Sequence, residues 1–144
     1  MKLWLKILIG LMIAGIIAGF LVYKFLINKH QPDYEKLKPE YSLDAGAFYR
    51  EFKVNPDNAH KLYNGKMVQL SGKLSKIENT DSLAIAVFVF NQGLFGDEGV
   101  RCTVLKKFNA EVKKLKPDGI IRIKGVCSGF TGTDVIVEHC SLIY

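Results

Sequence analysis

The sequence has no acidic residue before Asp33 and no charged residue of either sign from Ile7 to Tyr23. This apolar run is longer than the roughly 7–15 residues of a secretory signal core. About 17–20 such residues cross a hydrocarbon layer of roughly 30 Å. We therefore predict a membrane anchor over residues 1–27, with a transmembrane helix at about residues 4–26 in contact with the lipid bilayer. A cleaved signal peptide and a buried core helix are the alternatives, but the run ends without a small-residue cleavage site.

Basic residues flank the apolar run on both sides, so the positive-inside rule does not decide its orientation. Lys2 and Lys6 precede the run, and Lys24 and Lys29 follow it. A short basic tail before a long apolar run is typical of a signal anchor. We therefore expect a single-pass protein of the cell membrane with its C-terminal domain outside the cytosol, and the opposite orientation stays open.

Small residues recur along the predicted transmembrane helix. Gly15 and Gly19 have the GxxxG spacing that lets two membrane helices approach closely. A homodimer through this face is therefore one prediction. Because glycine is also common in membrane helices, a face without a partner is the alternative.

The net charge of the whole chain overstates the net charge of the part that follows the apolar run. The whole chain carries +6, but four of its 20 basic residues flank the apolar run. Beyond residue 30, 16 basic residues stand against 14 acidic ones, a net charge of +2. A nucleic-acid-binding domain is expected to gather basic residues on one face. The densest basic run, residues 106–116, has the spacing of a solvated helix face, so the sequence argues against nucleic acid as a partner.

Cysteine is scarce, and Cys102, Cys127 and Cys140 form no CxxC pair. Structural zinc ligands normally occur in close pairs, and the adjacent His139 and Cys140 would point to opposite faces of a strand. We therefore predict no metal site and no cofactor. Outside the cytosol we expect one disulfide, Cys102–Cys127 or Cys127–Cys140, whereas in the cytosol all three thiols would be small buried groups.

Two prolines and several charges mark residues 28–41 as a linker. We predict a folded domain over residues 42–144 that begins with two short helices within residues 43–64. Asp44 and Asn55 are the expected N-caps of these helices, and Pro56 follows the second cap. The expected apolar sides of the two helices comprise Leu43, Ala47, Phe48, Phe52, Ala59, Leu62 and Tyr63.

Five later segments have strand patterns, and a helical pattern separates the third from the fourth. This order predicts a mostly β domain with helices, namely the five-stranded, partly open barrel of the OB-fold. A ubiquitin-like or other α+β roll is the alternative, but glycines inside the first and fourth strands favour a curved barrel. The predicted strands cover residues 66–77, 82–90, 100–105, 120–129 and 133–144, and the predicted helix covers residues 106–119.

Two runs resemble a known family. NAHKLYNGKMVQLSG, residues 58–72, and IKGVCSG, residues 123–129, resemble the start and the end of the tRNA-anti-like OB-fold family of bacterial proteins. The resemblance covers about residues 43–144. It implies an OB-fold that often follows a signal or an anchor, and it implies neither catalytic residues nor a settled ligand. The tRNA in the family label reflects a likeness to anticodon-binding domains and does not assign a function.

OB barrels bind ligands across their second and third strands and nearby loops. If the alternate residues of the second strand fill the core, Phe88 and Phe90 lie outward beside Arg101 and Thr103, with Phe130 on a neighbouring loop. Aromatic rings with an arginine form a stacking surface for bases, sugars or peptide side chains. The alternative is that the leading helices cover this face and the phenylalanines belong to the core.

No group of residues assembles into a catalytic site. Cys127 with His139 and the pair Asp97–Glu98 come nearest, but neither provides a nucleophile or an acid beside a clear partner. We therefore predict a membrane-tethered, non-catalytic binding or interaction module whose partner is a glycan, a peptide or an envelope protein. A single-stranded nucleic-acid-binding domain that faces the cytosol is the alternative.

Overall fold

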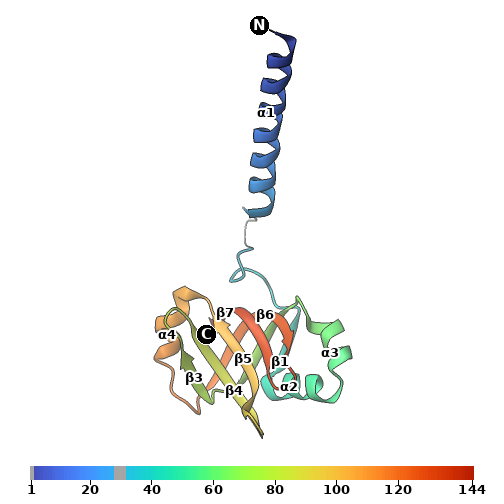
Figure 1. The fold of residues 1–144 in the computed structure, drawn as a ribbon. Coiled ribbons are helices and arrows are strands. Elements are labelled where there is room, and N and C mark those ends of the chain that lie inside the picture. Colours follow the sequence, from blue (N-terminus) through green and yellow to red (C-terminus); the bar gives the residue numbers. More distant parts are fainter. Residues whose placement is uncertain (1, 28–31) are drawn as a thin grey trace. The chain divides into compact units, whose positions relative to one another are not determined.

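The computed structural model describes residues 2–27 and 32–144 and divides the chain into two compact units, Met1–Pro32 and Asp33–Tyr144. Each unit is described by itself here. Figure 1 shows one long helix in the first unit and a sheet with short helices in the second.

The first unit is one apolar helix. α1 (Leu3–Val22) continues as a π-helical turn, η1 (Tyr23–Ile27). The stretch Leu3–Leu26 spans 24 residues and buries none of its side chains. At 1.5 Å per residue it is about 36 Å long, which exceeds a hydrocarbon thickness of about 30 Å. The helix predicted at about residues 4–26 is therefore present, and it is long and apolar enough to anchor the chain in a membrane.

The second unit contains a single seven-stranded sheet, with β1 at one end and β3 at the other. Its strands follow the order β1-β2-β6-β7-β5-β4-β3. In chain order the elements are β1 (Tyr41–Asp44), α2 (Ala45–Val54), α3 (Pro56–Tyr63), β2 (Met67–Lys73), β3 (Lys76–Asn79), β4 (Ala84–Gly93), β5 (Gly96–Val104), η2 (Lys106–Phe108), α4 (Asn109–Lys113), β6 (Ile120–Phe130) and β7 (Val135–Ile143).

One bent segment gives this sheet its curvature. β2 pairs antiparallel with β6, β3 pairs antiparallel with β4, and only Leu74 and Ser75 separate β2 from β3. The Ser75 N–H donates to the Val87 carbonyl at 3.0 Å, and the Ser75 hydroxyl accepts from the Val89 N–H at 2.9 Å. The Leu74 N–H instead donates to the Gly119 carbonyl at 2.9 Å. The two halves of this segment therefore pair with distant strands and curl the sheet around one core.

The prediction of five strands is wrong, although the mixed strand and helix composition is confirmed. The bend at Leu74 and Ser75 divides the first predicted strand into β2 and β3. The segment Tyr41–Asp44, expected at the end of the linker and the start of a helix, instead pairs with β2 as the parallel strand β1. The helix between the third and fourth predicted strands is present but short, since η2 and α4 end at Lys113.

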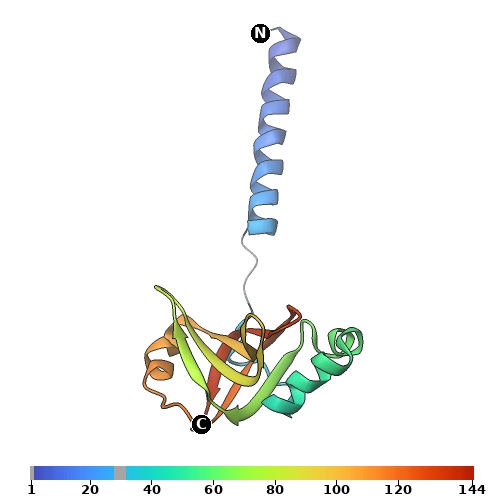
Figure 2. The ribbon, with the colours of Figure 1, turned by 60° about the horizontal axis from the view of Figure 1, so that its bottom comes forward.

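Both leading helices are present, and their predicted caps are confirmed. The Asp44 carboxylate accepts the Ala47 N–H at 3.0 Å, and the Asn55 side-chain oxygen accepts the Asn58 N–H at 3.2 Å. Figure 2 shows α2 and α3 on one side of the second unit and α4 on the opposite side. The two leading helices bury Ala45, Phe48, Tyr49, Phe52, Ala59 and Tyr63, whereas the predicted apolar residue Leu62 is exposed.

Part of the predicted linker packs on the second unit. Residues 28–31 lie outside the described residues, but the Glu40 N–H donates to the Met67 carbonyl at 2.8 Å. The Lys124 ammonium donates to the carbonyls of Glu35 and Leu37 at 2.7 and 3.0 Å. The compact unit therefore begins at Asp33, before the predicted boundary at residue 42.

Phe88 lies in the core and is 0% exposed. It stands opposite Val100 on β5. A Cβ added at Gly72 of β2 would lie 3.4 Å from the Phe88 ring and 3.0 Å from the Ala45 Cβ. The glycine in β2 therefore provides room for α2 and the Phe88 ring to approach the strand closely.

The burial of Phe88 generates a matched pair of stability predictions. We expect Phe88→Ala to lower the free energy of unfolding by about 3–5 kcal/mol, because it removes a buried ring and leaves a cavity. The matched control Phe90→Ala removes a ring that is 43% exposed and should cost about 0.5–1.5 kcal/mol. Urea denaturation of both variants measures the difference, and equal losses would contradict the assigned core.

Candidate interaction face on β4 and β5

On the face of β4 and β5 that points away from the core, Arg101 and Thr103 lie as predicted, but Phe88 of β4 does not. The strand register sets Val87 opposite Arg101 and Ile85 opposite Thr103, whereas Phe88 pairs with Val100 in the core. The prediction that Phe88 lies outward beside Arg101 is therefore wrong. Both faces of β4 are apolar, so the alternation of residue types could not identify the core face. Val87 on this side is only 1% exposed, so the accessible part of the outward face comprises Ile85, Val89, Arg101 and Thr103.

The predicted aromatic residues do not gather around Arg101. Phe90 lies where the β4–β5 register shifts, and its ring stacks on Tyr49 of α2 with centroids 5.6 Å apart. Phe130 is half-buried at the end of β6, and its ring lies 5.7 Å from that of Phe52. Of the five predicted ligand-binding residues, only Arg101 and Thr103 share the outward face.

Arg101 is held by two carboxylates. Its guanidinium donates to Glu78 at 2.5 Å and lies 3.3 Å from an Asp134 oxygen. Partial burial opposes the charged form, but the charges of Asp134 and Glu78 outweigh that effect and raise the pKa of Arg101. The neighbouring Lys76 ammonium lies 3.2 Å from Glu78 and 2.8 Å from Asp97. Two cations thus stand among three carboxylates, so this cluster carries a formal charge of −1.

The loop between β6 and β7 is fixed to the edge of this face. The second carboxylate oxygen of Asp134 accepts the Gly99 N–H at 3.0 Å. A Cβ at Gly99 would lie 1.8 Å from the Phe88 carbonyl oxygen, so only glycine fits at that point of β5. The loop, the Arg101 network and the core strand therefore hold one another in place.

Glu98 attaches the β4–β5 hairpin to α2. Its carboxylate accepts hydrogen bonds from the Tyr49 hydroxyl at 3.2 Å, from Lys53 at 3.0 Å and from the Asn91 amide at 3.0 Å. The Asn91 hydrogen bond, followed by that of Lys53, lowers the pKa of Glu98. The adjacent Asp97 instead faces Lys76, so these two carboxylates serve different contacts. This role could not be predicted from the sequence because Tyr49 and Lys53 come from α2, 49 and 45 residues away along the chain.

The three thiols are free and buried. Cys102 and Cys127 are both in register with Val137, on opposite sides of β7. Strands lie about 4.8 Å apart, so two strand spacings exceed the roughly 7 Å between Cα atoms that a disulfide tolerates. The predicted Cys102–Cys127 bridge is therefore wrong. Cys127 and Cys140 lie on neighbouring strands, and both thiols are free.

Cys127 and His139, which come nearest to a catalytic pair, have different partners: the Cys127 thiol lies 3.8 Å from the Asn64 side-chain oxygen. Burial raises the pKa of the Cys127 thiol to about 11, so the thiolate is scarce at neutral pH. His139 stacks on Tyr34, with ring centroids 4.1 Å apart. Among residues 2–27 and 32–144, no group of three or more His, Cys, Asp or Glu residues is arranged to hold a metal ion.

The lowered pKa of Glu98 predicts an acid-sensitive contact. A carboxylate with a depressed pKa stabilises the fold above its unfolded pKa, near 4.5 for glutamate, and loses that contribution as the pH falls through its folded value. We therefore expect Glu98→Gln to lower stability at pH 7 and to weaken the decline between about pH 5 and pH 3. Urea midpoints measured across this range test the prediction. The control is Asp81→Asn, at an exposed carboxylate without a hydrogen bond within the described residues, and an unchanged slope in Glu98→Gln would contradict it.

Comparison with known proteins identifies the family. The sequence model of the tRNA_anti-like family matches residues 1–142. No sequence among the curated proteins matches the chain.

A solved structure with a TM-score above 0.5 shares the fold at low sequence identity. A "putative nucleic acid-binding lipoprotein" from Klebsiella pneumoniae is 14% identical with a TM-score of 0.54, and the match covers 81% of this chain and 100% of that one. Aspartyl tRNA synthetase from Entamoeba histolytica is 14% identical with a TM-score of 0.47, covering 79% of this chain and 23% of that one. Since the family match extends over nearly the whole sequence, the chain belongs to the tRNA_anti-like family of OB-fold proteins.

Proposed function

We propose that the chain is a membrane-tethered, non-catalytic OB-fold module that binds a peptide or protein across the outward face of β4 and β5. The observation that carries this proposal is the Arg101 network. The Arg101 guanidinium is already paired with Glu78 and Asp134, so its attraction to a phosphate backbone is weakened. Half-buried Ile85, Val89 and Thr103 beside it offer apolar contact and a hydroxyl, which suit a peptide. A glycan would use the same Thr103 hydroxyl.

The apolar helix supports the tether. Its uncharged surface suits lipid, and we propose that the second unit lies outside the cytosol, as the short basic N-terminal tail favours. A Cβ added at Gly15 or Gly19 would meet nothing within 4 Å, so a second helix has access to this face. A homodimer of anchors through these glycines is part of the proposal.

A non-catalytic role fits the residues that sequence analysis considered for chemistry. A thiol with a pKa of about 11 is a poor nucleophile at neutral pH, and Cys127 lies inside the core. Asp97 and Glu98 are engaged by Lys76 and Lys53, so each carboxylate serves structure.

Single-stranded nucleic acid is the second candidate ligand. The Klebsiella pneumoniae protein of known structure is described as a "putative nucleic acid-binding lipoprotein". The segment from η2 to the end of α4 and beyond also carries five exposed lysines on a surface other than the outward face of β4 and β5. These are Lys106, Lys107, Lys113, Lys114 and Lys116.

Photocrosslinking distinguishes the two candidates. A benzoylphenylalanine at Thr103, in the full chain expressed in its own membrane, reports on the outward face, and the same residue at exposed Lys61 of α3 is the matched control. We expect protease-sensitive adducts of discrete mass from position 103 and none from position 61. Adducts removed by nuclease would favour the second candidate. No adduct at position 103, with the chain present in the membrane, would contradict the proposed face.

A further inference from the structure

The turn of the β4–β5 hairpin exposes two adjacent apolar side chains. Leu94 is 98% exposed and Phe95 is 97% exposed, between Gly93 and Gly96. We call Leu94 and Phe95 the apolar finger. Single exposed apolar residues are ordinary, but two neighbouring large side chains at the tip of a hairpin leave apolar surface without cover.

The finger is part of an ordered hairpin. The β4–β5 pairing continues to its tip, with Gln92 opposite Asp97 and Gly93 opposite Gly96. The Asp97 carboxylate accepts hydrogen bonds from Gln92 and from Lys76, which comes from the neighbouring strand β3. Together with the attachment of Glu98 to α2, these contacts hold the backbone of the hairpin up to its tip.

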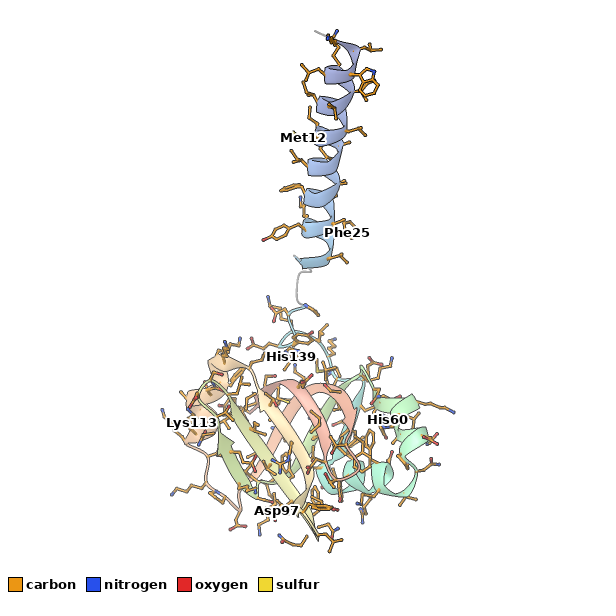
Figure 3. The ribbon with its side chains drawn as sticks, in the orientation of Figure 1. Met12, Phe25, His60, Asp97, Lys113 and His139 are labelled. Atoms are coloured by element: carbon orange, nitrogen blue, oxygen red, sulfur yellow. The ribbon has the colours of Figure 1, made fainter. Side chains whose placement is uncertain are left out.

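Within the second unit, the finger points away from the end at which the chain enters. Tyr34 stacks on His139, and Figure 3 shows His139 and Asp97 at opposite ends of the unit. The hairpin therefore projects from the side opposite the entering segment, where the second unit offers it no cover. The finger is therefore open to contact with another molecule.

We propose that the apolar finger packs against the apolar finger of a second copy of the chain held in the same membrane. Two side chains bury far less than the roughly 800 Å² per partner of a standard stable interface. The occupant must therefore be a molecule that is already concentrated nearby, and a shared membrane provides such an effective concentration. This inference rests on the tether in the proposed function, and the open Gly15–Gly19 face is a second point at which two copies can meet.

The charges at the base of the hairpin suit a two-fold contact. Lys53 and Lys76 stand beside Glu98 and Asp97, so both signs are present around the finger. In an isologous interface the same patch occurs on both copies, and a patch with both signs can oppose each cation with a carboxylate. A patch of one sign would repel its copy.

A tryptophan at the tip tests this contact. Trp4 is the chain's single tryptophan, so Trp4→Phe with Phe95→Trp places one reporter on the finger. The purified full chain is reconstituted into vesicles, and flotation confirms that it is in the bilayer. We expect blue-shifted emission at a low lipid-to-protein ratio, reverting to the emission of a solvent-exposed ring on about 100-fold dilution with lipid, as mass action requires.

Matched variants and brominated lipid complete the test. Leu94→Asp should abolish the blue shift, while Val54→Asp, at an apolar residue that is 85% exposed on α2, should retain it. Thermal unfolding of both variants should match that of the parent. Three results would each overturn the finger contact. The tryptophan emission could stay at the wavelength of an exposed ring at every lipid-to-protein ratio, or its blue shift could persist on dilution with lipid. Brominated lipid could also quench the emission, which would place the ring in the bilayer. A chain that fails to float would overturn the tether itself, so the two failures are distinguishable.

Discussion

The pairing of one bent segment with two different strands of the sheet, β6 and β4, is the constraint on which the rest of the domain depends. Met67–Asn79 pairs with β6 through its first half and with β4 through its second half. The bend at Ser75 is held by two hydrogen bonds to β4, which curl the sheet around Phe88. The same bend brings Lys76 and Glu78 beside Arg101. Curvature, core and surface charge therefore share one cause.

Two charged networks on the surface of the domain connect the elements that this pairing brings together. Arg101 joins β3, β5 and the loop before β7 through Glu78 and Asp134, and Glu98 joins the hairpin to α2. Both networks neutralise charges on the side where an OB-fold commonly binds its ligand. Arg101 and Lys76 on this side are each paired with carboxylates, and we propose that the contact energy there comes mostly from shape and apolar area. In the proposed contact between two copies, the apolar finger likewise contributes apolar area.

Local signals in the sequence predicted the helices well, and long-range pairing explains the rest. Asp44 and Asn55 act through hydrogen bonds three residues away, so their caps could be predicted from neighbouring positions. β4 is apolar on both faces, so its pattern could not show that Phe88 points inward; only the register with β5 decides that. The Cys102–Cys127 bridge failed for the same reason, because β7 lies between the two strands. Glu98 gathers partners from α2 and β4, which no spacing in the sequence records.

The account as a whole depends on a domain that is tethered to a membrane and exposed outside the cytosol. A C-terminal reporter that is active only outside the cytosol measures this most directly, with a cytosol-active reporter fused at the same position as its control. The account predicts activity from the first reporter and silence from the second. The reverse result would contradict it, would leave the thiols in a reducing compartment, and would make single-stranded nucleic acid the leading ligand class.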